Sequence, residues 1–178
     1  PKIIRQPQNR VDLVFEIDEG AETGVRRIVF VGNEEYSDSA LRDVIGTQES
    51  AWWAVLRVSD TYDPDRLAFD RELLRRFYLS EGYADFQVRS AVAELTPDEE
   101  DFVLTFTIEE GIRYEFGGAS VRSEISDVDV GPLFDLITHD SGDWYDADEV
   151  DRTVGRVTDA VADLGYAFVE VRPEIERA

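Results

Sequence analysis

The tripeptide Gly-Tyr-Ala occurs twice in this sequence, at residues 82–84 and at residues 165–167. Each copy lies between a stretch with helical spacing of apolar residues and a β-rich run, FQV in the first case and FVEV in the second. Glycine adopts the left-handed conformation without steric cost, so it ends a helix and turns the chain. Gly82 with Tyr83, and Gly165 with Tyr166, therefore predict two structural joints between a helix and a strand.

Further matches indicate that the whole unit around the joint is repeated. A Tyr-Asp pair at residues 62–63 recurs at residues 145–146 with the same offset of 83 as the two joints. VDLVFEIDEG at residues 11–20 matches FVLTFTIEEG at residues 102–111 with an offset of 91. The two offsets, 91 and 83, differ by eight, which predicts eight additional residues in the first copy. We place them in residues 46–59, which contain Trp52 and Trp53. These tryptophans are expected to pack the insertion on the core, and contact with an accessory protein is the alternative.

Local start and stop signals predict the element order β-α-α-β-β in the first copy. Ser37 is expected to cap a short helix, and Asp63 followed by Pro64 is expected to open a long one. A Gly32-Asn33 turn ends the first strand, and a Thr96-Pro97-Asp98 turn joins the last two. The predicted strands are residues 25–31, 85–94 and 102–109, and the predicted helices are residues 38–45 and 64–81.

The second copy repeats this plan but lacks the last strand. Its predicted strands are residues 114–121 and 168–175, and its short helix is residues 132–137. Asp146 and Glu149 predict a capping box for a long helix that Gly165 ends. Residues 1–22 are then expected to be the tail hairpin of a preceding unit, residues 23–111 a complete unit, and residues 112–178 a second unit without its return strand.

The composition excludes several classes of function. The chain has no Cys, hence no disulfide or thiolate metal site, and its net charge of −22 argues against a nucleic-acid partner. Without Met, Pro1 is not expected to be a natural start, and a segment of a longer protein is expected. The single histidine, His139, has no nucleophile-elbow motif to support a catalytic role. DVDVGPLFDLI at residues 127–137 begins like an EF-hand loop but misplaces its glycine and lacks the final glutamate, so an acidic calcium-binding module is a remote alternative. We expect no enzyme, no cofactor and no metal.

Several stretches together resemble the POTRA repeats of the BamA branch of the Omp85 family. They are GNEEYSDSALR, the paired Trp, YDPDRLAFDRELLRRFYLSEGYADFQV, AELTPD and FTIEEG, and they extend over essentially the whole chain. The insertion with two tryptophans most resembles the third of five repeats, so the chain would hold the end of the second, the whole third and most of the fourth. The resemblance implies an α+β fold of tandem repeats, each with a small three-stranded mixed sheet and two helices on one face.

The resemblance also implies a function. Such repeats form a periplasmic arm at the outer membrane, ahead of a β-barrel, and assist the assembly of outer-membrane proteins. The implied partners are unfolded client proteins, lipoproteins such as BamB, and a periplasmic chaperone. POTRA arms of TamA-like and two-partner secretion transporters are alternatives. The implied binding site is the edge strand after the first joint, which pairs with an added strand by β-augmentation: Asp85, Phe86, Gln87, Val88, Arg89, Ser90, Ala91 and Val92.

The unmatched return strand at residues 11–19 generates a testable prediction. Its apolar residues are in register with those of residues 102–109, so it fits the place that the second unit leaves open. The linker at residues 20–24 spans at most about 18 Å, and a unit is about 25–30 Å across, so the strand reaches that place only in a neighbouring molecule. Strand exchange predicts concentration-dependent light scattering that deletion of residues 1–19 abolishes. A strict monomer, unaffected by the deletion, would instead indicate an open second unit.

Overall fold

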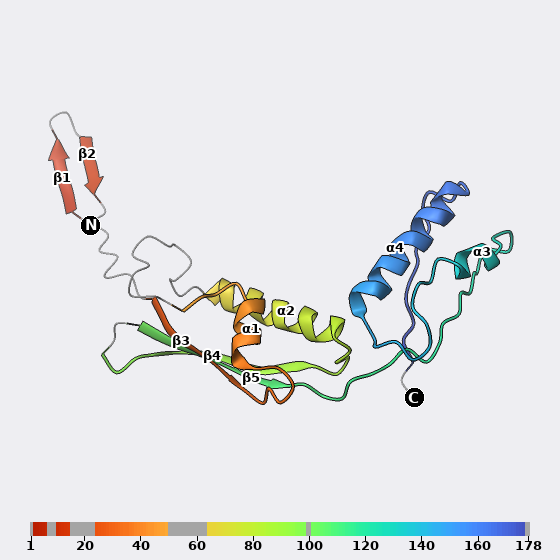
Figure 1. Ribbon diagram of the computed structural model, residues 1–178. Helices are drawn as coiled ribbons and strands as arrows, with labels where there is room; N and C mark the ends of the chain where they lie inside the picture. The colour runs from red at the N-terminus through yellow and green to blue at the C-terminus, as the bar shows by residue number, and fades with distance from the viewer. Residues whose placement is uncertain (1, 7–9, 15–23, 50–63, 99–100, 177–178) are drawn as a thin grey trace.

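The computed structural model describes residues 2–6, 10–14, 24–49, 64–98 and 101–176 (Figure 1). The strands β1 (Lys2–Gln6) and β2 (Arg10–Val14) pair antiparallel within the region expected to be a tail hairpin. The two tryptophans of the insertion, the first Tyr-Asp pair and its expected Asp63 cap lie outside the described residues.

The first unit has the predicted order β-α-α-β-β. Its elements are β3 (Gly24–Val31), α1 (Asp38–Val44), α2 (Pro64–Ser80), β4 (Gln87–Leu95) and β5 (Asp101–Glu109). The strand order is β3-β5-β4, with β3 parallel and β4 antiparallel to β5. Both helices lie on the same side of this sheet (Figure 1). The expected mixed three-stranded sheet with two helices on one face is therefore confirmed.

Capping explains where the helices of the first unit begin and end. The hydroxyl of Ser37 accepts a hydrogen bond from the backbone N–H of Ala40 at 3.3 Å, so Ser37 is the N-cap of α1 as predicted. Helix α2 begins at Pro64 and is followed by Gly82, which has a φ of +101°. The backbone N–H of Tyr83 donates to the carbonyl of Tyr78 at 2.9 Å and closes the helix end.

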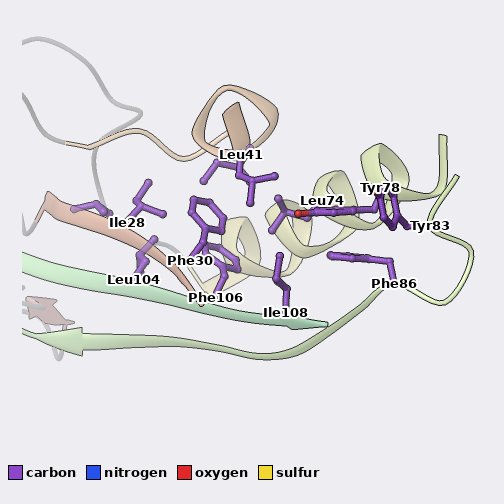
Figure 2. Packing of buried hydrophobic residues seen from close by; sticks show 12 residues of the cluster. Ile28, Phe30, Leu41, Leu74, Tyr78, Tyr83, Phe86, Leu104, Phe106 and Ile108 are labelled. Carbon is purple, nitrogen blue, oxygen red and sulfur yellow. The ribbon is translucent and has the colours of Figure 1, made fainter. Parts of the chain in front are cut away.

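Alternating apolar residues form the core between sheet and helices, as Figure 2 shows. On β5, Leu104, Phe106 and Ile108 are buried and point toward the helices, and Phe106 stacks on Phe30 of β3 with ring centroids 5.5 Å apart. Burial of such side chains supplies most of the favourable free energy of folding. The other large members of this core are Ile28, Leu41, Leu74, Tyr78, Tyr83 and Phe86.

A buried carboxylate connects the end of β5 with two other parts of the unit. Glu110, only 7% exposed, accepts a hydrogen bond from the hydroxyl of Tyr78 at 2.7 Å. It also accepts from the backbone N–H groups of Glu34 at 3.0 Å and Glu35 at 3.1 Å. Burial, together with the hydrogen bond to Glu110, raises the pKa of Tyr78, so the phenol remains a donor. The Glu110-Gly111 corner, which ends the matched stretch at residues 102–111, therefore anchors the end of β5 to the rest of the unit.

The second unit contains helices but no sheet within the described residues. It has α3 (Gly131–Phe134) and α4 (Ala147–Asp163), and α3 is shorter than the predicted helix at residues 132–137. The strands predicted at residues 114–121 and 168–175 are wrong: only an isolated bridge between Glu115 and Trp144 forms. In the first unit the two equivalent strands pair only with β5, and no described residue of the second unit takes that place. Without a central strand their N–H and C=O groups have no ladder to join.

The caps of α4 agree with the sequence in part. Asp146 accepts hydrogen bonds from the backbone N–H groups of Asp148 at 2.8 Å and Glu149 at 3.2 Å, so it is the predicted N-cap. The side chain of Glu149 does not complete the capping box, because it bonds to Thr138, Arg152 and Arg156 instead. Beyond the helix, Gly165 has the predicted positive φ, +101°. In the part of the chain that the structure describes, no helix combines the length and apolar character needed to cross a membrane.

The turn after β3 provides a test of the fold. Gly32 has a φ of +91°, and a Cβ at this position would lie 2.2 Å from the carbonyl oxygen of Ile108. Gly32→Ala is therefore expected to lower the free energy of unfolding by about 2–3 kcal/mol. Gly155→Ala, in an exposed turn of α4 with open space around it, should instead raise the stability of the second unit by about 0.5–1 kcal/mol. Urea titration monitors both, and an unchanged midpoint for Gly32→Ala would contradict the close approach of the two strands.

Candidate functional site

The predicted binding strand lies at the edge of the sheet, beside the central strand β5. Six of its eight expected residues, Gln87, Val88, Arg89, Ser90, Ala91 and Val92, belong to β4. Asp85 and Phe86 do not, because the chain is still in the turn at these positions. Phe86 is buried and stacks on Tyr78 with ring centroids 4.1 Å apart, and Asp85 accepts a hydrogen bond from the hydroxyl of Tyr114 at 2.6 Å.

The hydrogen-bonding direction of β4 follows from one bond at its end. The backbone N–H of Thr96 donates to the carbonyl of Asp101 at 2.8 Å, in register with the β4–β5 ladder. Because bonded and non-bonded pairs alternate in an antiparallel ladder, the N–H of Val92 points toward β5 and those of Ala91 and Ala93 point outward. A bulge between Val88 and Ser90 shifts the register nearer the start of the strand. The outward groups of Ala91 and Ala93 form the part of the edge that can receive another strand.

Side chains occupy the opposite edge of the sheet at Ile28. The backbone N–H of Ile28 in β3 donates to Oε1 of Glu49 at 2.8 Å, and Nε of Arg42 donates to the carbonyl of Ile28 at 3.5 Å. Glu49 and Arg42 also form an ion pair at 3.4 Å. These bonds use the outward donor and acceptor of Ile28, whereas no described side chain bonds to the backbone of Ala91 or Ala93. The two edges therefore differ, and β4 is the open one.

A shallow groove runs between β4 and α2. Phe86, Gln87 and Val88 form one wall. The other wall consists of one stripe of α2, spaced as expected for a single helix face: Ala68, Arg71, Glu72 and Arg75. A strand added to β4 would direct every second side chain toward this groove, because side chains alternate across a strand.

The first Gly-Tyr-Ala joint contacts the beginning of the second unit. The carbonyl of Gly82 accepts from the backbone N–H of Tyr114 at 2.9 Å, and Nε of Arg113 donates to the carbonyl of Glu81 at 2.7 Å. The guanidinium of Arg113 lies 4.2 Å from the ring centroid of Trp144. A Cβ on Gly82 would meet Cγ of Arg113 at 2.9 Å, so this glycine is needed for close approach as well as for its φ. The joint is thus also the contact between the two units.

The second joint has a different environment. Tyr166 packs, partly buried, against the small apolar cluster of the second unit, whose buried members are Val128, Leu133, Val157 and Val161. A Cβ on Gly165 would meet no atom within 4 Å. Within the described residues, this joint therefore has a free surface where the first has a docked segment.

The loop considered for calcium and His139 both make local contacts within the described residues. Among the described residues, no group of three or more His, Cys, Asp or Glu side chains is arranged to hold a metal ion. In the loop considered for calcium, Asp129 accepts a bond from the backbone N–H of Gly131 at 3.0 Å. His139 stacks on Phe116 with ring centroids 3.7 Å apart. The candidate accessory contacts, Trp52 and Trp53, lie outside the described residues.

Sequence reasoning missed three residues of this region. Arg113 and Tyr114 bond to the first unit and Trp144 lies against Arg113, but none of the three belongs to the repeated motifs. A positional signal was available, because only Ile112 separates the Glu110-Gly111 corner from Arg113 and Tyr114, and Trp144 directly precedes the Tyr-Asp pair. Glu110 was recognised only as part of the corner.

Similar proteins include two outer membrane protein assembly factors named BamA. The protein from Neisseria meningitidis serogroup B is 29% identical over 171 residues, with 96% of this chain and 22% of the relative covered. The protein from Neorickettsia risticii is 31% identical over 173 residues, with 97% and 23% covered. The chain therefore spans less than a quarter of the length of these relatives.

The fold is similar to that of solved POTRA domains. The crystal structure of Haemophilus influenzae BamA POTRA3-5 superposes with a TM-score of 0.67 at 20% identity, covering 82% of this chain and 57% of that one. The POTRA family, described as surface antigen variable number repeat, matches residues 23–111 and, a second time, residues 121–178. Since these two matches include well over half of the chain, the protein belongs to the POTRA family.

Proposed function

We propose that this chain is part of a periplasmic arm at the outer membrane and acts as a binding scaffold, not an enzyme, in the assembly of outer-membrane proteins. Its similarity to assembly factors named BamA supports the pathway. The open edge of β4 supports the mechanism, in which an unfolded client adds a strand to the sheet. We further propose that accessory lipoproteins such as BamB, and a periplasmic chaperone, use this edge or the adjoining joint.

The contrast between the two edges is the observation that carries this proposal. An edge strand has unpaired N–H and C=O groups that bond readily to another extended segment. Here the side chains of Glu49 and Arg42 satisfy Ile28 on one edge, whereas Ala91 and Ala93 have outward groups on the other. Main-chain hydrogen bonds depend little on side-chain identity, so such an edge accepts many different sequences. This property suits clients that have nascent β-strands in common.

Amide hydrogen exchange of the free protein tests the contrast. The amides of Ala91 and Ala93 should exchange at least about tenfold faster than those of Val92 and Ile28, because only the latter two donate bonds inside the protein. Glu49→Ala should accelerate exchange at Ile28 and leave Val92 unchanged. Equal protection of Ala91 and Val92 would show that the β4 edge is already covered.

A proline scan of β4 tests strand addition. Proline has no backbone N–H, so Ala91→Pro removes an outward donor while sparing the bonds between β4 and β5. Binding of a strand-forming client peptide, measured by titration calorimetry, should weaken by about tenfold while the melting temperature falls by only a few degrees. Val92→Pro is the matched control: Val92 is 46% exposed, but its N–H points toward β5, so this variant should lose about 3 kcal/mol of stability.

Two results would contradict the proposal. Unchanged peptide affinity in Ala91→Pro, with the fold intact by circular dichroism, would place recognition elsewhere. Equal loss of stability in Ala91→Pro and Val92→Pro would show that the outward direction of the Ala91 N–H is wrong. Ala93→Pro repeats the first test at the next outward N–H along the edge. A loss of affinity that comes only from altered packing at Ala91 would not recur in this variant.

A further inference from the structure

We infer that the groove beside β4 selects extended segments that have acidic side chains at alternate positions, held by Arg71 and Arg75. This inference rests on the proposed strand addition and specifies the chemistry of the strand that is added. The main observation behind it is that the groove beside the open edge has an excess of positive charge, although the chain has a net charge of −22.

The two arginines lie where an added strand would pass. Arg71 and Arg75 belong to the stripe of α2 that forms one wall of the groove, opposite Phe86, Gln87 and Val88. Side chains of an added strand that point to the helix side of the sheet would enter between these walls. The same face of β4 packs on the core through Val88, Ala91 and Ala93.

Arg71 and Arg75 are available to bind an incoming carboxylate, although acidic residues outnumber basic ones by 40 to 18 in the chain. Arg71 is exposed and makes no hydrogen bond or ion pair with any residue that the structure describes. Among the described residues, Arg75 forms an ion pair only with Glu72, at 3.8 Å, and both side chains of this pair are 56% exposed. By contrast, Arg89 on β4 is already paired with Glu109. An exposed pair at such a distance contributes little free energy, so an incoming carboxylate can displace Glu72.

The spacing of the two guanidinium groups matches a strand. Arg71 and Arg75 are four residues apart on a helix, which corresponds to an axial rise of about 6 Å. Residues i and i+2 of a strand are separated by about 6.7 Å and point to the same face. Two carboxylates at alternate positions can therefore each meet one arginine. Glu72 is the one acidic side chain in the groove wall, and the charged groups there sum to +1, so acidic segments are favoured over basic ones.

Peptide binding to the full 178-residue chain tests this inference. The probes are three amidated strand-forming peptides that differ only at two alternate positions, occupied by Glu, Gln or Lys, so that no terminal carboxylate competes. The Glu peptide should bind about tenfold more tightly than the Gln peptide at low salt, and the difference should shrink as ionic strength rises.

Charge reversal on α2 assigns the preference to the groove. R71E/R75E should lose the preference for Glu and bind the Lys peptide more tightly than the Glu peptide. R76E is the matched control, because Arg76 is exposed on the same helix, lies outside the groove and pairs with no described residue. It adds half as much negative charge to the same helix as R71E/R75E does, and it should keep the Glu preference.

The outcomes separate this inference from the proposed function. If all three peptides bind equally and Ala91→Pro weakens all of them, strand addition stands and the acidic preference is overturned. If R76E abolishes the preference as fully as R71E/R75E, the effect belongs to the overall field of the protein and the groove assignment is overturned. If none of the peptides binds, both the proposed function and this inference fail.

Discussion

The central strand β5 determines the architecture of the first unit, because β3 and β4 both pair with it and not with each other. β5 is the last element of the unit in sequence. The sheet is therefore complete only when β5 has inserted between β3 and β4. Its inward side chains Leu104, Phe106 and Ile108 lie at the centre of the core (Figure 2). No described residue of the second unit takes the place of β5. The helices of this unit form and bury a small apolar cluster, but residues 114–121 and 168–175 have no central strand with which to pair.

With β5 in the centre, β3 and β4 are the two edges of the sheet, and their outward backbone groups differ in whether side chains bond to them. Glu49 and Arg42 bond to the outward backbone groups of Ile28, which is a way of blocking an edge without another strand. The β4 edge has no such protection among the described residues, and α2 overhangs it with a groove of mixed apolar and cationic character. Selective exposure of one edge connects the fold to the proposed binding of client strands. In that proposal, backbone groups supply general affinity and the groove supplies chemical preference.

Most of the edge strand β4 could be predicted from the sequence, but its first residue could not. Residues 87–92 follow a glycine-terminated helix and have the alternation of a strand, and both signals are local. Asp85 and Phe86 continue that pattern in sequence but lie outside the strand. Phe86 stacks on Tyr78 in the core, and Asp85 accepts a hydrogen bond from Tyr114. Arg113 and Glu81 are 32 residues apart and meet only because the second unit docks on the joint at Gly82. No periodicity within one element encodes such a contact.

Residue types and their spacing were enough to predict the repeat, the order of elements in the first unit, the positive φ of Gly82 and Gly165, the caps at Ser37 and Asp146, and the family. These features depend on backbone conformation and on neighbours a few residues away, which residue type controls directly. Three features became visible only in the folded chain: which edge is open, the burial of Glu110 against Tyr78, and the absence of the two predicted strands from the described part of the second unit. The physical reason is that a strand, an edge and a buried charge are defined by partners distant in sequence. Their backbone bonds and solvation exist only once those partners are in place.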